Sequence, residues 1–240
     1  MKNVLLFSFI ILVFASGCRE IAGRRIRGNG HITSQTRSVS GFRNVEVSGA
    51  IDVYVKQDSA TSVKVEADDN ILEYVQVHTN GSTLEIYTES GFNLRPSNKI
   101  KVFLTNPGFD GLDISGACTI TSENELTSSE RINLNLSGAS EGRLAINAPS
   151  VIIEVSGAST AELKGRTKDL DVSAHGASRV RGYDLMTENS DVNISGASHA
   201  ELYASVSLDG EASGASSVYY MGNASNNIRP SGASHVGKKE

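Results

Sequence analysis

The chain has 240 residues, a length that fits one extended domain or two ordinary ones. Glycine is frequent, proline is rare and 20% of the residues are charged, which excludes a collagen, a coiled coil and a charged disordered tail. The formal net charge of −5 gives no electrostatic reason to bind phosphate backbones, so we expect no nucleic-acid partner.

The N-terminus has the three-part layout of a secretory signal. Lys2 precedes an apolar stretch at residues 4–14 that is too short to span a bilayer comfortably. The small residues before Cys18 resemble a bacterial lipobox. We therefore predict a signal peptide at residues 1–17 and a lipid anchor on Cys18, which makes the membrane a partner and places the protein in the cell envelope, preferentially at the outer membrane. The alternative is an ordinary cleaved signal that leaves a free thiol.

Residues 18–37 are expected to form a lipid-anchored tether. Residues 19–30 have no apolar periodicity, and the arginines among them can also contact anionic headgroups. With Cys18 acylated, Cys118 is the only remaining cysteine, so no intramolecular disulfide is expected.

A β region is predicted over residues 38–109. Apolar and polar residues alternate at 45–47, 51–55 and 63–65, the pattern of half-buried strands. An Asn-Gly pair at residues 80 and 81 separates two further apolar runs and predicts a β-hairpin. Residues 71–74 are expected to form one helical turn. We expect this partly antiparallel region to cap the repeat that follows.

An internal repeat occupies residues 110–240. From Gly116 onward, corner glycines follow one another at intervals of 22, 19, 19, 20, 18 and 18 residues, mostly within Ser-Gly-Ala. Apolar residues four and two positions before each glycine alternate with polar ones, which predicts a strand, and a second strand follows the corner. Units this short share a core only by stacking, so the predicted fold class is all-β, a parallel β-helix. We expect the corner glycine to allow a sharp bend and the adjacent alanine to lie inside.

Several segments together resemble one known family. They are Val39-Ser40-Gly41-Phe42, residues 48–53, residues 63–68 and the serial Ser-Gly-Ala-Ser corners. In these the chain is similar to the head-GIN-domain family of auto-transporter adhesins, envelope proteins of Gram-negative bacteria that are frequently lipoproteins. The resemblance covers residues 38–236 and implies a β-helical fold at the cell envelope and an adhesin function. It supplies no catalytic residues.

Stacking the coils brings acidic residues into columns. We expect one column to contain Asp171, Asp191 and Asp209, and the neighbouring column to contain Asp113, Glu154 and Glu211. Stacked carboxylates repel unless they are neutralised, so this face is a candidate site for a cation, or for a basic or hydroxyl-rich ligand such as a glycan. The alternative is a solvated face that keeps the β surface soluble.

The function predicted from these features is that of a non-enzymatic envelope lipoprotein, an adhesin or binding scaffold that presents a rigid polar face. The five histidines are scattered, which favours surface positions over a metal site, and no cofactor is expected. The expected partner is a glycan, an envelope protein or a host surface protein. One alternative is a structural protein that assembles through its coil edges. Another is a polysaccharide-acting enzyme, which the near-identical corners disfavour.

Overall fold

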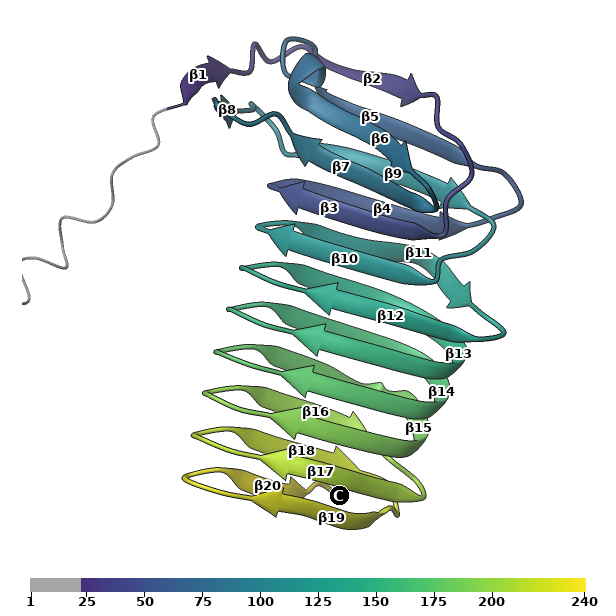
Figure 1. Ribbon diagram of the computed structural model, residues 1–240, viewed down its shortest axis with the longest axis vertical. Helices are drawn as coiled ribbons and strands as arrows, with labels where there is room; N and C mark the ends of the chain where they lie inside the picture. The colour runs from purple at the N-terminus through teal and green to yellow at the C-terminus, as the bar shows by residue number, and fades with distance from the viewer. Residues whose placement is uncertain (1–22) are drawn as a thin grey trace, which may run out of the picture.

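The computed structural model describes residues 23–240, which form a parallel β-solenoid with a partly antiparallel N-terminal cap (Figure 1). This confirms the predicted fold class. The predicted signal peptide and Cys18 lie outside the described residues. Within residues 23–240, no helix has the length and apolar character needed to cross a bilayer.

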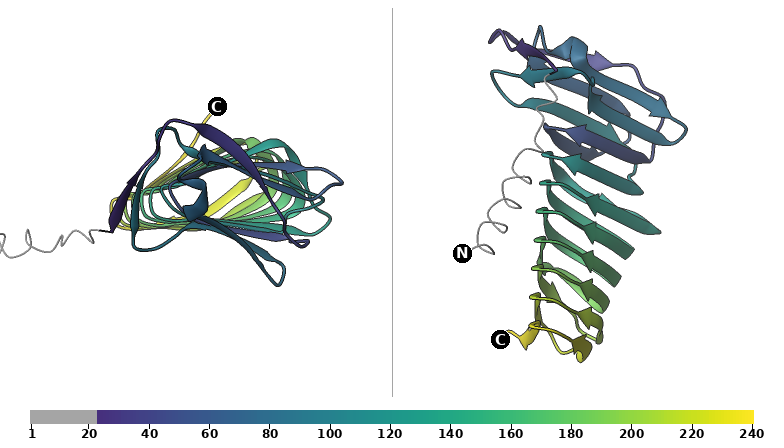
Figure 2. Two further views of the ribbon diagram at one scale, coloured as in Figure 1. Left: turned by 90° about the horizontal axis from the view of Figure 1, so that it is seen from above. Right: turned by 60° about the vertical axis from the view of Figure 1, so that its left-hand side comes forward.

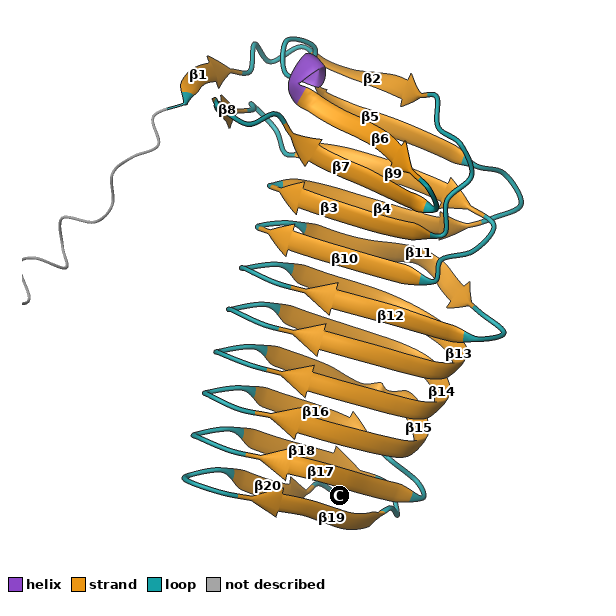
Figure 3. Ribbon diagram, in the orientation of Figure 1, coloured by secondary structure: helices purple, strands orange, loops and turns teal. Residues whose placement is uncertain are grey.

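Two parallel sheets form the body of the solenoid, and three long strands bend from one sheet into the other (Figure 3). Sheet A contains the strands that precede the corners: β3 (Asn44–Gly49), β10 (Gly111–Gly116), β12 (Arg131–Leu136), the second halves of β13 (Glu141–Val155), β14 (Thr160–Ala174) and β15 (Arg179–Ile194), β17 (Ser207–Ala212) and β19 (Ser225–Pro230). Sheet B contains the strands that follow the corners: β4 (Ile51–Gln57), β11 (Thr119–Thr127), the first halves of β13 to β15, β16 (His199–Tyr203), β18 (Ser217–Met221) and β20 (His235–Lys238).

The core lies between these sheets and is built from small and medium aliphatic side chains. The predicted inward positions are buried along most of the stack; Leu134, Ile153 and Val172, which pair in register, are each at most 1% exposed. Only near the last coil does the pattern weaken, because Gly210 is half-buried and Pro230 is exposed. The predicted alternation of inward and outward side chains along these strands is therefore confirmed.

Antiparallel strands cover the N-terminal end of the stack (Figures 1 and 2). The predicted hairpin is present as β6 (Val75–Asn80) and β7 (Thr83–Thr88), and the helical turn as a 3-10 helix (Leu72–Tyr74). β5 (Ser62–Asp68) pairs antiparallel with both β2 (Ile32–Arg37) and β9 (Ile100–Asn106). The parallel ladder also extends upstream of residue 110, since β3 and β4 pair in register with β10 and β11.

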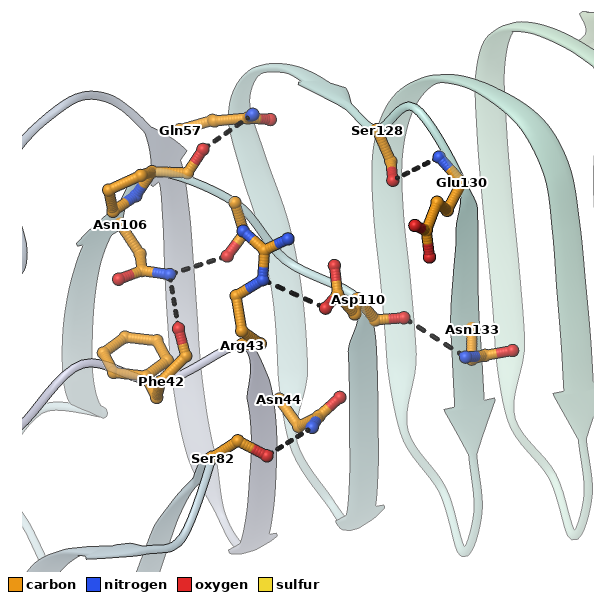
Figure 4. Close-up of polar contacts among 12 residues, drawn as sticks. Phe42, Arg43, Asn44, Gln57, Ser82, Asn106, Asp110, Ser128, Glu130 and Asn133 are labelled. Atoms are coloured by element: carbon orange, nitrogen blue, oxygen red, sulfur yellow. Dashed lines mark hydrogen bonds and ion pairs between the residues drawn. The ribbon is translucent and has the colours of Figure 1, made fainter.

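Side chains connect the cap to the first coils (Figure 4). The buried Asn106 amide donates to the carbonyl oxygens of Phe42 at 2.8 Å and Gly108 at 2.6 Å. Arg43 forms an ion pair with Asp110 at 3.0 Å. These contacts hold the chain where it enters the repeat from the cap, and they satisfy backbone groups that the ladder leaves unpaired.

The structure corrects the expectation of an irregular tether. Residues 24–27 form strand β1 (Arg24–Arg27), which pairs parallel with β8 (Phe92–Arg95), and residues 32–37 form β2. The sequence signal is weak because β1 has one apolar residue, Ile26, which packs with Leu94 against the edge of the core. Pairing with distant strands, rather than local periodicity, orders this segment.

The corner glycines form a column along one edge of the solenoid. Gly157 has a φ of +73°, and a Cβ there would collide with the carbonyl oxygen of Gly138 in the preceding coil. The same approach repeats from Gly116, which faces the Gly49 carbonyl, to Gly232, which faces that of Gly214. Any side chain at these positions would separate the coils, and the left-handed backbone favours glycine independently.

The expected place of the corner alanine is wrong. Ala158 is exposed, because its N–H donates to the Gly138 carbonyl oxygen at 2.8 Å and its side chain then points outward. The next residue, Ser159, is fully buried instead. Equivalent serines cap the turn: the Ser140 hydroxyl donates to the Ser137 carbonyl oxygen at 2.8 Å, the geometry of a side-chain-stabilised turn.

Replacing Gly157 with valine should destabilise the fold by about 3 kcal/mol, because the substitution combines backbone strain with a steric clash between coils. Chemical denaturation measures this as a lower midpoint. Ala158→Val is the matched control, since its exposed side chain should change the unfolding free energy by less than about 0.5 kcal/mol. Equal midpoints for the two variants would contradict the packing of the glycine column.

Candidate functional site

The predicted acidic column lies on sheet A. Asp171 pairs in register with Asp191, which in turn pairs with Asp209. Neighbouring parallel strands lie ~4.8 Å apart, so these carboxylates are adjacent on the outer face. The sequence thus placed this column correctly, and the ligand role predicted for it stays a prediction.

The neighbouring column is interrupted. Asp113, Glu154 and Glu211 occupy equivalent positions, but Asn135 separates the first two and two polar residues separate the last two. The Asn135 amide donates to Asp113 at 3.2 Å. Repulsion between acidic side chains is therefore relieved within the column itself.

Amide groups also donate hydrogen bonds to carboxylates of the first column. The Asn193 amide donates to Asp191 at 2.7 Å, and the Asn227 amide donates to Asp209 at 2.9 Å. Asp171 has no such donor among the described residues. Burial raises its pKa above the ordinary value, and the neighbouring Asp191 and Glu154 raise it further. The positive charge of Arg131 opposes this rise in pKa but does not cancel it.

The acidic face does not form a metal centre. Across residues 23–240, no group of three or more His, Cys, Asp or Glu side chains is arranged to hold a metal ion. Side chains of one column leave a sheet in parallel directions, so their carboxylates do not converge on one point. A hydrogen-bonding ligand that lies along the column fits this arrangement better than a single cation.

A second candidate site, not found from the sequence, lies on sheet B. Glu162 pairs with Arg181, and Lys164 pairs with Asp184, so β15 contains one more residue than β14 between these pairs. The extra residue belongs to the Gly182-Tyr183 segment. On β11, three residues lie opposite one residue of β13 between the pairs made by Thr121 and Glu125. Such bulges redirect side chains and are frequent beside functional sites.

The two bulges border one hollow of about 570 Å³, which we call the Tyr183 groove. Leu144 and Leu163 are among its lining residues, but both are buried, at 2% and 4% exposure. Its lining comprises Thr121, Ser122, Arg143, Leu144, Ala145, Glu162, Leu163, Lys164, Arg181, Tyr183, Asp184 and Glu201. A lining that combines apolar and polar residues is typical of small-molecule and saccharide-sized sites.

Charges alternate along the border of the Tyr183 groove. Arg143, Glu162, Arg181 and Glu201 come from successive coils of sheet B. Glu162 forms an ion pair with Arg143 at 3.4 Å and a second ion pair with Arg181. This ladder presents donors and acceptors in turn and keeps the local net charge near zero, unlike the acidic face.

Tyr183 is the residue of this groove with unsatisfied hydrogen-bonding capacity. Its hydroxyl oxygen is buried and has no hydrogen-bond partner within the described part of the chain. Burial raises the pKa of the phenol, and the nearby Glu201 and Tyr219 raise it further, so the hydroxyl stays protonated and able to donate. A buried hydroxyl without a partner costs free energy, which a ligand acceptor would recover.

The comparisons with known proteins agree with the resemblance seen in the sequence. The family model described as "Putative auto-transporter adhesin, head GIN domain" matches residues 41–224. The chain therefore belongs to the head GIN domain family, whose adhesin-like character points to an envelope or surface location. No curated protein sequence matches the chain significantly.

Solved structures support the fold independently. A protein of Bacteroides fragilis described as a "putative adhesin" is 18% identical with a TM-score of 0.84, and the match covers 89% of this chain and 100% of that one. A second "putative adhesin", from Parabacteroides distasonis, is 21% identical with a TM-score of 0.72, over 90% and 100% of the two chains. A "putative lipid binding protein" of the same organism is 21% identical with a TM-score of 0.69, again over 90% and 100%. At these identities the likeness establishes the fold alone.

Replacing Asp171 with asparagine should stabilise the protein at neutral pH. The pKa of Asp171 is higher in the folded protein than the ordinary value of 3.8, so its ionised form opposes folding, and this cost disappears as the pH falls through that range. We expect a rise in Tm on the order of 1 °C at pH 7 that vanishes near pH 3.

Thermal unfolding at both pH values measures this effect. Asp209→Asn is the matched control, because Asp209 already accepts a hydrogen bond from Asn227 and should gain less. A lower Tm for Asp171→Asn at pH 7 would show that its charge stabilises the acidic face.

Proposed function

We propose that this protein is a non-enzymatic, lipid-anchored adhesin of the cell envelope, and that it binds a hydroxyl-rich glycan in the Tyr183 groove. Membership of the head GIN domain family supports the adhesin role. The lipobox-like sequence that ends at Cys18 supports the anchor. The solenoid then acts as a rigid arm that presents its faces away from the membrane.

The position of the two bulges is the main reason for choosing the Tyr183 groove as the binding site. Two bulges interrupt the ladder of sheet B, and both border the Tyr183 groove. A bulge inserts residues that the stack does not need, so its presence beside the groove is better explained by a ligand than by folding. The unpartnered Tyr183 hydroxyl lies at the second bulge.

The chemistry of the lining favours a glycan. Sugar hydroxyls both donate and accept hydrogen bonds, which matches a border where arginine donors alternate with glutamate acceptors. The half-buried ring of Tyr183 offers contact for the apolar face of a sugar ring. The acidic face of Asp171, Asp191 and Asp209 is a second surface of the same adhesin, suited to further hydroxyls or to a basic patch on an envelope or host protein.

The ion pairs of the groove support binding rather than hydrolysis. Glycoside hydrolysis needs one carboxyl group that gives a proton and a second that acts as base or nucleophile. Glu162 is instead held between Arg143 and Arg181. Both of its carboxylate oxygens are therefore occupied, one by each guanidinium group.

A glycan array probed with the detergent-solubilised full-length protein tests the proposed ligand. We expect binding to a subset of glycans, and Tyr183→Phe should weaken it about threefold to tenfold because one buried hydrogen bond to the ligand is lost. Tyr54→Phe is the control, since Tyr54 lies on sheet B outside the groove.

The outcomes of this experiment separate the candidate surfaces. Unchanged affinity in Tyr183→Phe, together with a loss in the triple variant Asp171→Asn/Asp191→Asn/Asp209→Asn, would move the site to the acidic face. Retention of a lipid spotted on the same array, with no glycan bound, would contradict the proposed ligand; this arm is included because one structural neighbour is described as lipid-binding.

The lipid anchor has its own test. In a Gram-negative host, mass spectrometry of the mature protein should show that residues 1–17 are absent and that Cys18 is acylated. Cys18→Ser should move the protein from the membrane pellet to the soluble fraction. Cys118→Ser should leave it in the pellet, since Cys118 is buried at a corner position that serine occupies in other coils. An unmodified Cys18 would overturn the anchor.

A further inference from the structure

Strands β1 and β8 form a separate two-stranded ribbon at the N-terminal end of the molecule (Figure 1). In this ribbon Ile26 pairs with Leu94, and both pack against the core. Side chains alternate across a strand, so the residues that flank this pair point away from the core. Arg25, Arg27 and Arg95 therefore share the outer face of the ribbon.

The three arginines line a hollow of about 730 Å³, which we call the arginine hollow. The rest of its lining is Gly28, Asn29, Gly30, Pro96 and Ser97. All three arginines are exposed, and none is in an ion pair within residues 23–240. The hollow thus combines strong positive charge with guanidinium groups that are not already occupied.

A buried carboxylate fixes the walls of the arginine hollow. Asp68 accepts from the Gly30 N–H at 2.7 Å, and from the Ser97 N–H at 2.8 Å and hydroxyl at 2.6 Å. Burial alone would raise the pKa of Asp68, but these hydrogen bonds outweigh it and hold the pKa below the ordinary value. Through these hydrogen bonds the ionised carboxylate joins the loop after β1 to the loop after β8.

The register of the ribbon creates a like-charge contact. Arg27 and Arg95 are direct partners in the parallel pairing, and Arg25 lies two residues away on the same face. Like charges at paired positions destabilise a sheet unless an anion lies between them. The polypeptide supplies acidic partners for Arg43, Arg143, Arg181 and Arg229 elsewhere, but none for these three within its described part.

The position of the arginine hollow in the chain indicates where its anion comes from. Arg24 is six residues after Cys18. Six residues span at most ~20 Å when fully extended, so an acyl chain on Cys18 would hold the ribbon within that distance of the membrane surface. Lipid phosphates are the anions present at high concentration there.

We infer that the arginine hollow binds the phosphate groups of anionic phospholipids and sets the orientation of the solenoid on its membrane. Arginine suits this task because its planar fork makes paired hydrogen bonds to phosphate oxygens. The ribbon then lies against the headgroups, and the long axis of the solenoid carries the Tyr183 groove away from them. This inference rests on the lipid anchor of the proposed function.

Vesicle co-sedimentation of a protein without acyl chains tests whether the arginine hollow binds anionic phospholipids. The protein is the mature chain from residue 18 with Cys18→Ser, and the vesicles contain either phosphatidylcholine alone or phosphatidylcholine with phosphatidylglycerol. We expect binding only to the anionic vesicles. The variant Arg25→Gln/Arg27→Gln/Arg95→Gln should lose about a hundredfold in partition coefficient, given the usual contribution of each basic residue near an anionic surface.

A charge-matched control variant distinguishes the effect of the arginine hollow on vesicle binding from the effect of the net charge of the protein. Arg43→Gln/Arg166→Gln/Arg229→Gln removes the same charge at sites remote from the ribbon and should keep most of the binding. An equal loss in the two triple variants would overturn the inference, as would equal binding to both kinds of vesicle. Inorganic phosphate, titrated by calorimetry, is the third arm: tight binding of phosphate with no binding to anionic vesicles would assign the hollow to a free anion and reject the lipid.

Failure of this inference can be told apart from failure of the anchor. Acylation of Cys18 is read by mass spectrometry of the native protein, independently of any vesicle. An acylated protein whose arginine variants bind vesicles like the control variant would keep the anchor and reject the arginine hollow. Anionic-vesicle binding by an unacylated native protein would reject the anchor and leave the headgroup site as a peripheral membrane contact.

Discussion

The close approach of successive corner backbones is the constraint on which the rest of this structure depends. At each corner a backbone N–H donates to the carbonyl oxygen of the glycine one coil earlier, as Ala177 does to Gly157 at 2.8 Å. Glycine permits both the left-handed backbone and the short separation. The aliphatic core is small in cross-section and similar in every coil, so the register of the corners decides which side chains meet.

That register has a consequence for charge. A solenoid places equivalent residues of successive coils directly beside one another, and like charges in one column repel. The two faces solve this differently: sheet A intersperses asparagine with aspartate, as at Asn227 and Asp209, whereas sheet B alternates arginine with glutamate, as at Arg143 and Glu162. The places where neither solution operates, at Asp171 and in the arginine hollow, are the places where an external partner or a stability cost is expected.

The sequence predicted the repeat, the strands and the acidic column because all three follow from one periodic signal. The sequence analysis did not find the Tyr183 groove, although the spacing of the corner glycines contains a sign of it. The intervals that follow Gly116 and Gly176, of 22 and 20 residues, are longer than the other intervals, and the two bulges lie within them. The sequence analysis also missed β1, which depends on pairing with β8, more than sixty residues away. Local patterns do not encode such pairings, and a strand with one inward residue leaves no period to detect.

The corner alanine shows a subtler limit. The small size of alanine suggested that it lies inside the corner. The direction of the backbone N–H instead decides which side chain turns inward. Serine takes the inner position since its hydroxyl can satisfy a turn carbonyl that alanine would leave without a partner. The size of a residue therefore predicts less at a tight turn than the backbone group that its position must satisfy.

The stacking of the corners can be measured directly with pairs of spin labels. The exposed alanines Ala139, Ala215 and Ala233 accept labels through cysteine substitution, in a chain whose own Cys18 and Cys118 are both replaced by serine. Ala139 and Ala215 are four coils apart, and Ala139 and Ala233 are five. At ~4.8 Å per coil the two pairs should give narrow distance distributions near 19 Å and 24 Å. Broad distributions, or a separation that does not grow with the number of coils, would contradict the stack.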